Sequence, residues 1–101
     1  MAYKQLTQSQ TGVGASSEIL FKNVSNDDFA MLINAYVTGT VTYDIEYTMD
    51  DVALASATWI ALGDTDRAAS SDDSFYFPVR ALRVNVKTGS GTVKLMTVYR
   101  G

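Results

Sequence analysis

The sequence predicts an all-β protein, an antiparallel β-sandwich or jelly roll of about seven to eight strands. Apolar and polar residues alternate through 40–48 and again through 80–87, as in strands that bury one face. Turn-forming residues recur about every ten residues, which is typical of sandwiches and barrels. We therefore expect little helix.

Residues 1–17 are mostly small or polar and show no sustained periodicity. The chain therefore divides into an N-terminal arm or edge segment, 1–17, and one β-sandwich domain, 18–101. As a flexible arm, the segment would become ordered on a partner, and Tyr3, Leu6 and Val13 would fill pockets in that partner. As an edge segment, it would be the first strand of the sandwich.

Residues 29–37 fit two patterns. Their apolar positions match one face of a helix with Asp27 or Asp28 as the N-cap, but they also suit a strand. We prefer the strand, because the short glycine-containing turn 37–40 leads directly into the next alternating segment. The sequence predicts a β-hairpin here.

A second hairpin is predicted near the C-terminus. Strand 80–87 alternates, and the glycine-rich turn 88–91 connects it to another strand at 92–100. Met96 and Val98 lie on the otherwise polar face of that last strand, so we expect a second covered face. Apolar residues on both faces of a strand favour a homo-oligomer.

Composition limits the possible functions. The 101-residue chain contains no cysteine and no histidine, and its formal net charge is −3. Without cysteine there is no disulfide or thiolate metal site, and without histidine the commonest general base and zinc ligand are missing. The basic residues are spread along the chain, so we expect neither nucleic-acid binding nor membrane binding.

Targeting signals are not recognisable in the sequence. No apolar run approaches the roughly 18 residues of a membrane span, and residues 1–10 lack the apolar region of a signal peptide. We expect a soluble protein that is synthesised in the cytoplasm.

Acidic residues occur in pairs that could be calcium ligands or the carboxylates of a glycosidase. Their spacing does not match an EF-hand loop, and turns in which an aspartate bonds its own backbone account for each pair. We therefore expect a protein that is not an enzyme, with no catalytic residue, no cofactor and no bound metal. The pairs are Asp50 with Asp51, Asp64 with Asp66, and Asp72 with Asp73.

Aromatic residues allow a carbohydrate-binding interpretation, in which Trp59 and its neighbours form a platform for sugar rings. Aromatic side chains at strand positions are more often part of the core, so the platform is the less favoured interpretation. The aromatic residues concerned are Trp59, Tyr43, Tyr47, Phe75, Tyr76, Phe77 and Tyr99.

Two arginines, Arg80 and Arg83, could pair with Asp44 or Glu46 across neighbouring strands. As exposed ion pairs they would each contribute roughly 0 to 1 kcal/mol.

Three segments resemble a known group of proteins: GTVTYDIEYTMDDV, ATWIALGD and the C-terminal FYFPVRALRVNVKTGSGTVKLMTVYRG. They fall within residues 37–101 and are similar to small virion proteins of tailed bacteriophages. In that group, a TVTY strand is followed by an acidic pair, a TW strand, an FPV strand and a terminal GSGTV hairpin. Residues 1–36 carry no part of this pattern.

The resemblance implies a capsid decoration protein that binds the outside of a phage head and bridges neighbouring capsid subunits. It implies the major capsid protein as partner, a homo-oligomer with a trimer preferred, and a location on the outer capsid surface of the virion. Two alternatives remain: another phage structural component, such as a head-fibre base or tail protein, and a carbohydrate-binding β-sandwich module.

Overall fold

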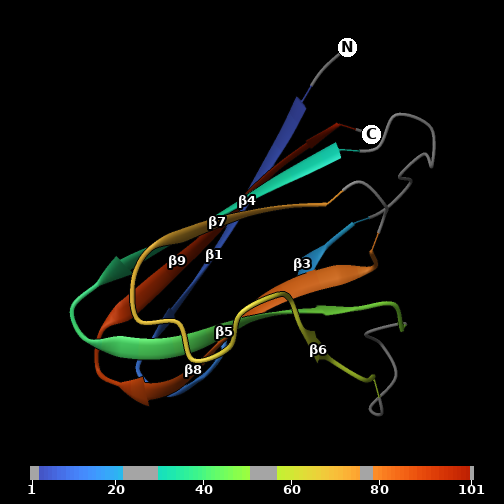
Figure 1. Ribbon diagram of the computed structural model, residues 1–101. Helices are drawn as coiled ribbons and strands as arrows, with labels where there is room; N and C mark the ends of the chain where they lie inside the picture. The colour runs from blue at the N-terminus through green and yellow to red at the C-terminus, as the bar shows by residue number, and fades with distance from the viewer. Residues whose placement is uncertain (1–2, 22–29, 51–56, 76–78, 101) are drawn as a thin grey trace.

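The computed structural model describes residues 3–21, 30–50, 57–75 and 79–100 and shows two antiparallel sheets packed face to face (Figure 1). Sheet A has the strand order β1-β9-β4-β7, and sheet B has the order β2-β8-β5-β6, with β3 also paired to β8. The predicted β-sandwich is therefore confirmed, with nine strands among the described residues. The strands are β1 (Tyr3–Thr11), β2 (Gly14–Ala15), β3 (Ile19–Leu20), β4 (Ala30–Thr38), β5 (Val41–Thr48), β6 (Ile60–Ala61), β7 (Ser71–Phe75), β8 (Ala81–Gly89) and β9 (Thr92–Arg100).

The ambiguous segment that follows Asp28 is a strand, as predicted, but both predicted hairpins are wrong. β4 lies in sheet A and β5 in sheet B, so these two strands are not paired with each other. β8 and β9 are separated between the sheets in the same way. Each glycine-containing turn is a corner at which the chain passes from one sheet to the other.

The two corners lie against each other, because the bent segment β4–β5 pairs with the bent segment β9–β8 on both sides of the fold. Thr38 is opposite Thr92 in sheet A, and Val41 is opposite Gly89 in sheet B. The amide of Gly91 donates to the carbonyl of Thr40 at 3.1 Å, which continues the pairing around the corner. The sandwich is thus one antiparallel sheet folded over on itself (Figure 1).

The core lies between the two layers and is built from the inward positions of the long strands. Sheet A contributes Met31, Ile33 and Leu95, while Tyr43 and Ile45 come from sheet B, and all five side chains are buried. The alternation in the sequence therefore reports the buried face correctly.

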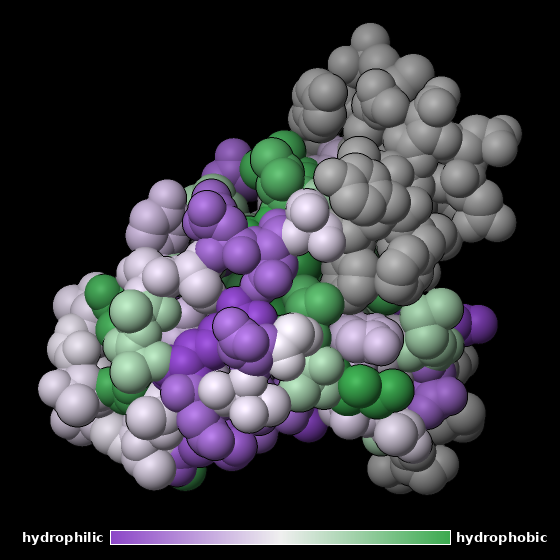
Figure 2. All heavy atoms as spheres, in the orientation of Figure 1, coloured by the Kyte–Doolittle hydropathy of each residue, from purple (hydrophilic) through white to green (hydrophobic). Residues whose placement is uncertain are grey.

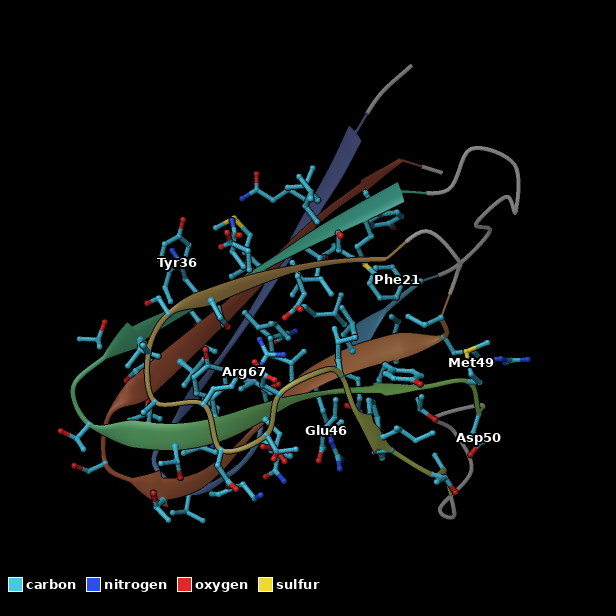
Figure 3. All side chains as sticks on the ribbon, in the orientation of Figure 1. Phe21, Tyr36, Glu46, Met49, Asp50 and Arg67 are labelled. Carbon is cyan, nitrogen blue, oxygen red and sulfur yellow. The ribbon has the colours of Figure 1, made fainter. Side chains whose placement is uncertain are left out.

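At the end of the sandwich away from the corners, an aromatic pair closes the core. The rings of Phe21 and Tyr99 meet edge to face, with centroids 5.0 Å apart, and Figure 3 shows Phe21 between the two layers.

Of the two interpretations of residues 1–17, the structure shows the edge strand. β1 pairs with β9 along all nine of its residues, from Tyr3 opposite Arg100 to Thr11 opposite Thr92, without an irregularity in the register. No helix in the described ranges is long and apolar enough to cross a membrane.

Candidate interaction surface

One long side of the sandwich, which we call the closed edge, is formed by β7 and by residues 60–67. Residues 60–67 run beside β5, where Arg67 exchanges two backbone hydrogen bonds with Tyr43, at 2.8 and 2.9 Å. The Arg67 side chain, only 8% exposed, turns toward β7 and contacts Asp73 at 2.6 Å and Ser71 at 2.8 Å. This arginine therefore ties the edge of sheet B to the edge of sheet A.

The closed edge is also polar on its surface. Asp64, Asp66 and Asp72 are exposed there, and Figure 2 shows hydrophilic residues over the middle of this face. Carboxylates on a short edge strand oppose the addition of another strand, because the pairing would remove their charge from water. β7 is thus a protected edge.

The outer face of sheet B carries two sets of ion pairs. Arg83 pairs with Glu46 at 2.7 Å, which is one of the pairings that the sequence allowed, and its guanidinium lies 4.2 Å from the centre of the Trp59 ring. Figure 3 shows Glu46 on the side of β5 away from sheet A. The stacked arginine occupies one face of the indole, so that face is not free for a sugar ring.

The second set is centred on Lys87, whose ammonium contacts Asp66 at 2.9 Å and Asp44 at 3.3 Å. The hydrogen bond to Asp66 and, next in size, the one to Asp44 raise the pKa of Lys87 above its ordinary value of 10.5. The predicted partner of Asp44 was Arg80 or Arg83. Asp44 pairs instead with Lys87, because Asp44 is opposite Asn85 in the register and Glu46 takes the position opposite Arg83.

Three members of the acidic pairs considered as calcium ligands bind other groups in the structure. Asp73 binds Arg67, Asp66 binds Lys87, and Asp50 accepts a hydrogen bond from the amide of Thr58 at 2.7 Å. Asp51, which forms a pair with Asp50 in the sequence, lies outside the described residues. In the part of the chain that the structure describes, no group of three or more acidic side chains is close enough to hold a metal ion.

The opposite long side, which we call the open edge, is formed by β1 in sheet A and by β2 and β3 in sheet B. Within the described residues, β1 pairs only with β9, so no strand is hydrogen-bonded to its other side. The side-chain amide of Gln10 donates to one carbonyl of β1, that of Thr11, at 3.3 Å. β1 is nine residues long, regular, free of proline and carries one charge, that of Lys4. Strands with these properties are the ones to which another strand adds most readily.

The other described edges differ from β1 in length or in charge. β2, β3 and β6 have two residues each, and β7 has five, two of which are aspartates. Between β2 and β3, Ser16 interrupts the strand that pairs with β8: its hydroxyl accepts a hydrogen bond from the amide of Val84 at 3.1 Å. β1 is therefore the long unprotected edge of the described structure.

A groove runs along the open edge between β1 and β3, with a volume of about 240 Å³. Apolar side chains from both sheets reach it, including Leu20, which is 41% exposed. The groove is lined by Leu6, Thr7, Gln8, Glu18, Ile19 and Leu20.

The structure does not bring the three residues predicted to attach to a partner into one place. Leu6 lies in the middle of β1, where it is opposite Thr97 of β9. Its side chain packs against the core and lines the groove. Val13 is 67% exposed at the corner between β1 and β2, and Tyr3 begins β1 at the other end. The sequence did not identify Leu20 as a residue of this surface. The irregular segment between β2 and β3 breaks the alternation that would have shown which way the Leu20 side chain faces.

The outer face of sheet A carries a second apolar area. Met96 and Val98, predicted to lie under a second cover, are half-buried there beside Leu32, which is 63% exposed. Figure 3 shows Tyr36 projecting from the same sheet, where its ring lies 5.5 Å from the ammonium of Lys94. This face adjoins the open edge, since Met96 is the partner of Thr7 in β1.

Comparison with known proteins yields a structural likeness but no family. No family model matches the chain, and no curated protein matches it. A solved structure of Bacillus endospore appendages, described as a novel family of disulfide-linked pili, has a similar fold, with a TM-score of 0.52 and 14% sequence identity. The match covers 97% of this chain and 85% of that chain. At this identity the likeness shows the fold, a β-sandwich, and nothing more specific.

The predicted role as a phage capsid decoration protein is wrong on these comparisons. The structural likeness is to an appendage of bacterial spores, and the family and curated comparisons supply nothing from a phage. The physical reason lies in the segments that suggested it. They consist of alternating strands and glycine-rich corners, and the structure uses them to build the sandwich itself, as many unrelated sandwiches do.

Proposed function

We propose that the protein is a structural subunit, without enzymatic activity, that associates non-covalently with copies of itself through the free edge of β1. The observation that carries the proposal is the difference between the two long sides of the sandwich. The closed edge is covered by residues 60–67 and carries charged side chains, whereas the open edge presents a nine-residue strand that is paired on one side only.

Strand addition at β1 would satisfy its free backbone groups. In an antiparallel pair, alternate residues direct their N–H and C=O groups to the new neighbour, so a nine-residue strand forms about eight to ten hydrogen bonds. At a net contribution of about 0.5 to 1.5 kcal/mol each, these bonds would offset much of the free-energy cost of association.

Two further features support a role in assembly. The apolar area on the outer face of sheet A reaches β9, where Met96 and Val98 stand beside β1, so it would lie next to the strand that an associating copy adds. The similar fold belongs to a protein that forms disulfide-linked pili. The present chain contains no cysteine, so its copies would be held by main-chain hydrogen bonds and packing alone.

The absence of histidine and cysteine from the chain supports a non-enzymatic role. The expected trimer, the capsid partner and the virion location depended on the resemblance to phage proteins, and they stay predictions that the structure does not test. The structure does not favour carbohydrate binding at Trp59, because Arg83 occupies one face of its ring.

The experiment introduces a lysine into each of the two edge strands of sheet A and compares the two variants. Thr7 in β1 and Ser74 in β7 are both exposed. Thr7→Lys places a charge in the open edge, so we expect it to abolish self-association in analytical ultracentrifugation across a concentration series. Ser74→Lys is the matched control and should associate as the wild type does.

Circular dichroism of both variants shows whether the fold is retained. A wild-type protein that stays monomeric at all accessible concentrations would contradict the proposal. So would folded variants in which both substitutions weaken association equally.

A further inference from the structure

We propose that the partner of β1 is β1 of a second copy, antiparallel and in register about Thr7, which forms a two-fold symmetric dimer. This inference rests on the proposed function, since it names the partner strand for the same edge. The two four-stranded sheets would join into one continuous sheet through a β1–β1 contact at its centre.

The lengths of the available edge strands favour a second β1 as the partner. A strand that adds to all of β1 must offer about nine residues. The other edges in the described parts of the chain have two or five residues, and β7 would bring Asp72 and Asp73 into the contact. A second β1 satisfies the free groups of both strands at once and introduces no carboxylate.

β1 is also complementary to itself. Pairing about Thr7, the middle residue, places Gln5 opposite Ser9 and Leu6 opposite Gln8 of the other copy. Lys4, the one charged residue of β1, falls opposite Gln10, so like charges do not meet.

The exposed and half-buried faces of β1 also match those of a second β1 in this register. Gln5, Thr7 and Ser9 are exposed on the outer face, while Leu6 and Gln8 are half-buried on the inner one. A register centred on a residue pairs outer positions with outer positions, and a shift by a single residue would pair them with inner ones. Among the registers that keep the faces matched, the one centred on Thr7 pairs all nine residues.

The groove beside β1 is consistent with this arrangement. An added strand would lie alongside Leu6 at the groove's opening and reduce the exposure of Leu20. On the outer face, Met96 and Val98 stand beside Thr7 and Gln5, so the apolar areas of the two copies would lie on either side of the paired strands.

Disulfide cross-linking tests the register, because the chain has no cysteine of its own. Directly opposite residues in an antiparallel pair have Cα atoms about 4.5 to 5.5 Å apart, which is within the range that a disulfide spans. Thr7→Cys should therefore form a covalent dimer under mild oxidation, and a reducing agent should reverse it.

Two controls define the register. Ser9→Cys places its two thiols about 13 Å apart along the paired strands, at about 3.3 Å for each of four residues, so it should not cross-link alone. A mixture of Gln5→Cys with Ser9→Cys should give the mixed dimer. Circular dichroism of each reduced variant confirms that it is folded.

The outcomes separate this inference from the proposed function. If the wild type associates but Thr7→Cys cross-links to Ser74→Cys and not to itself, the contact is head to tail between β1 and β7, and the symmetric dimer is overturned. Equal cross-linking of Thr7→Cys and Ser9→Cys would indicate random collisions and would also overturn it. If the wild type does not associate at all, the proposed function fails, and this pairing fails with it.

Discussion

Gly89 and Thr40 cross so closely at the corner of the sandwich that a Cβ atom on Gly89 would collide with the carbonyl oxygen of Thr40. The same Cβ would lie 2.9 Å from the Cα atom of Val41, which is also too close. Gly89 has a φ of +95°, a conformation that favours glycine. The corner of β8–β9 can therefore pack against the corner of β4–β5 only if this residue has no side chain.

Gly89→Ala should lower the free energy of unfolding by about 3 kcal/mol, from backbone strain together with the collision. Urea denaturation followed by circular dichroism measures the change. Gly12→Ala is the control: Gly12 has a φ of +73°, but a Cβ there would have no neighbour within 4 Å. It should cost only the conformational penalty of about 1 to 2 kcal/mol, and equal losses in both variants would contradict this account of the corner.

Two buried threonines should respond in opposite directions to replacement by valine. The Thr97 hydroxyl is buried and has no hydrogen-bond partner among the residues that the structure describes, so Thr97→Val should raise the free energy of unfolding by about 1 kcal/mol. The Thr48 hydroxyl donates to the carbonyl of Thr58 at 2.7 Å and accepts from the amide of Asp50 at 3.1 Å. Thr48→Val should therefore cost about 1 to 3 kcal/mol.

Chemical denaturation of both valine variants and the wild type provides the comparison. A loss of stability in Thr97→Val as large as that in Thr48→Val would show that the Thr97 hydroxyl has a partner in solution.

Lys87 should make stability depend on pH in the alkaline range. Its contacts with Asp66 and Asp44 raise its pKa in the folded state above that of the unfolded chain. The ion pairs therefore stabilise the protein fully below the unfolded pKa, and this contribution is lost as the pH rises through the folded pKa. The stability difference between the wild type and Lys87→Gln should be constant from about pH 7 to about pH 9 and should shrink above about pH 10.5.

Measuring that difference, and not the stability of the wild type alone, removes the titration of tyrosines and other lysines that both proteins share. The Lys87 side chain is 39% exposed, so added salt should also reduce the difference. A difference that is unchanged by both pH and salt would show that the ion pairs do not contribute.

The sequence by itself determined the all-β class, a strand in the segment 29–37 and the buried face of the long strands. These features are local, because the period of two in apolar residues depends only on which side of a strand meets the core. The pairing of Arg83 with Glu46 was one of four that the alternation allowed, and the register of β5 against β8 selected it.

Only the tertiary structure decided which strands are neighbours. A short glycine-containing turn can end a hairpin or carry the chain to a second sheet, and the choice depends on the opposing corner, where Gly89 packs against Thr40. The same holds for the two edges. That Arg67 closes one side while β1 is left open on the other follows from contacts between distant segments, which no local pattern in the sequence records.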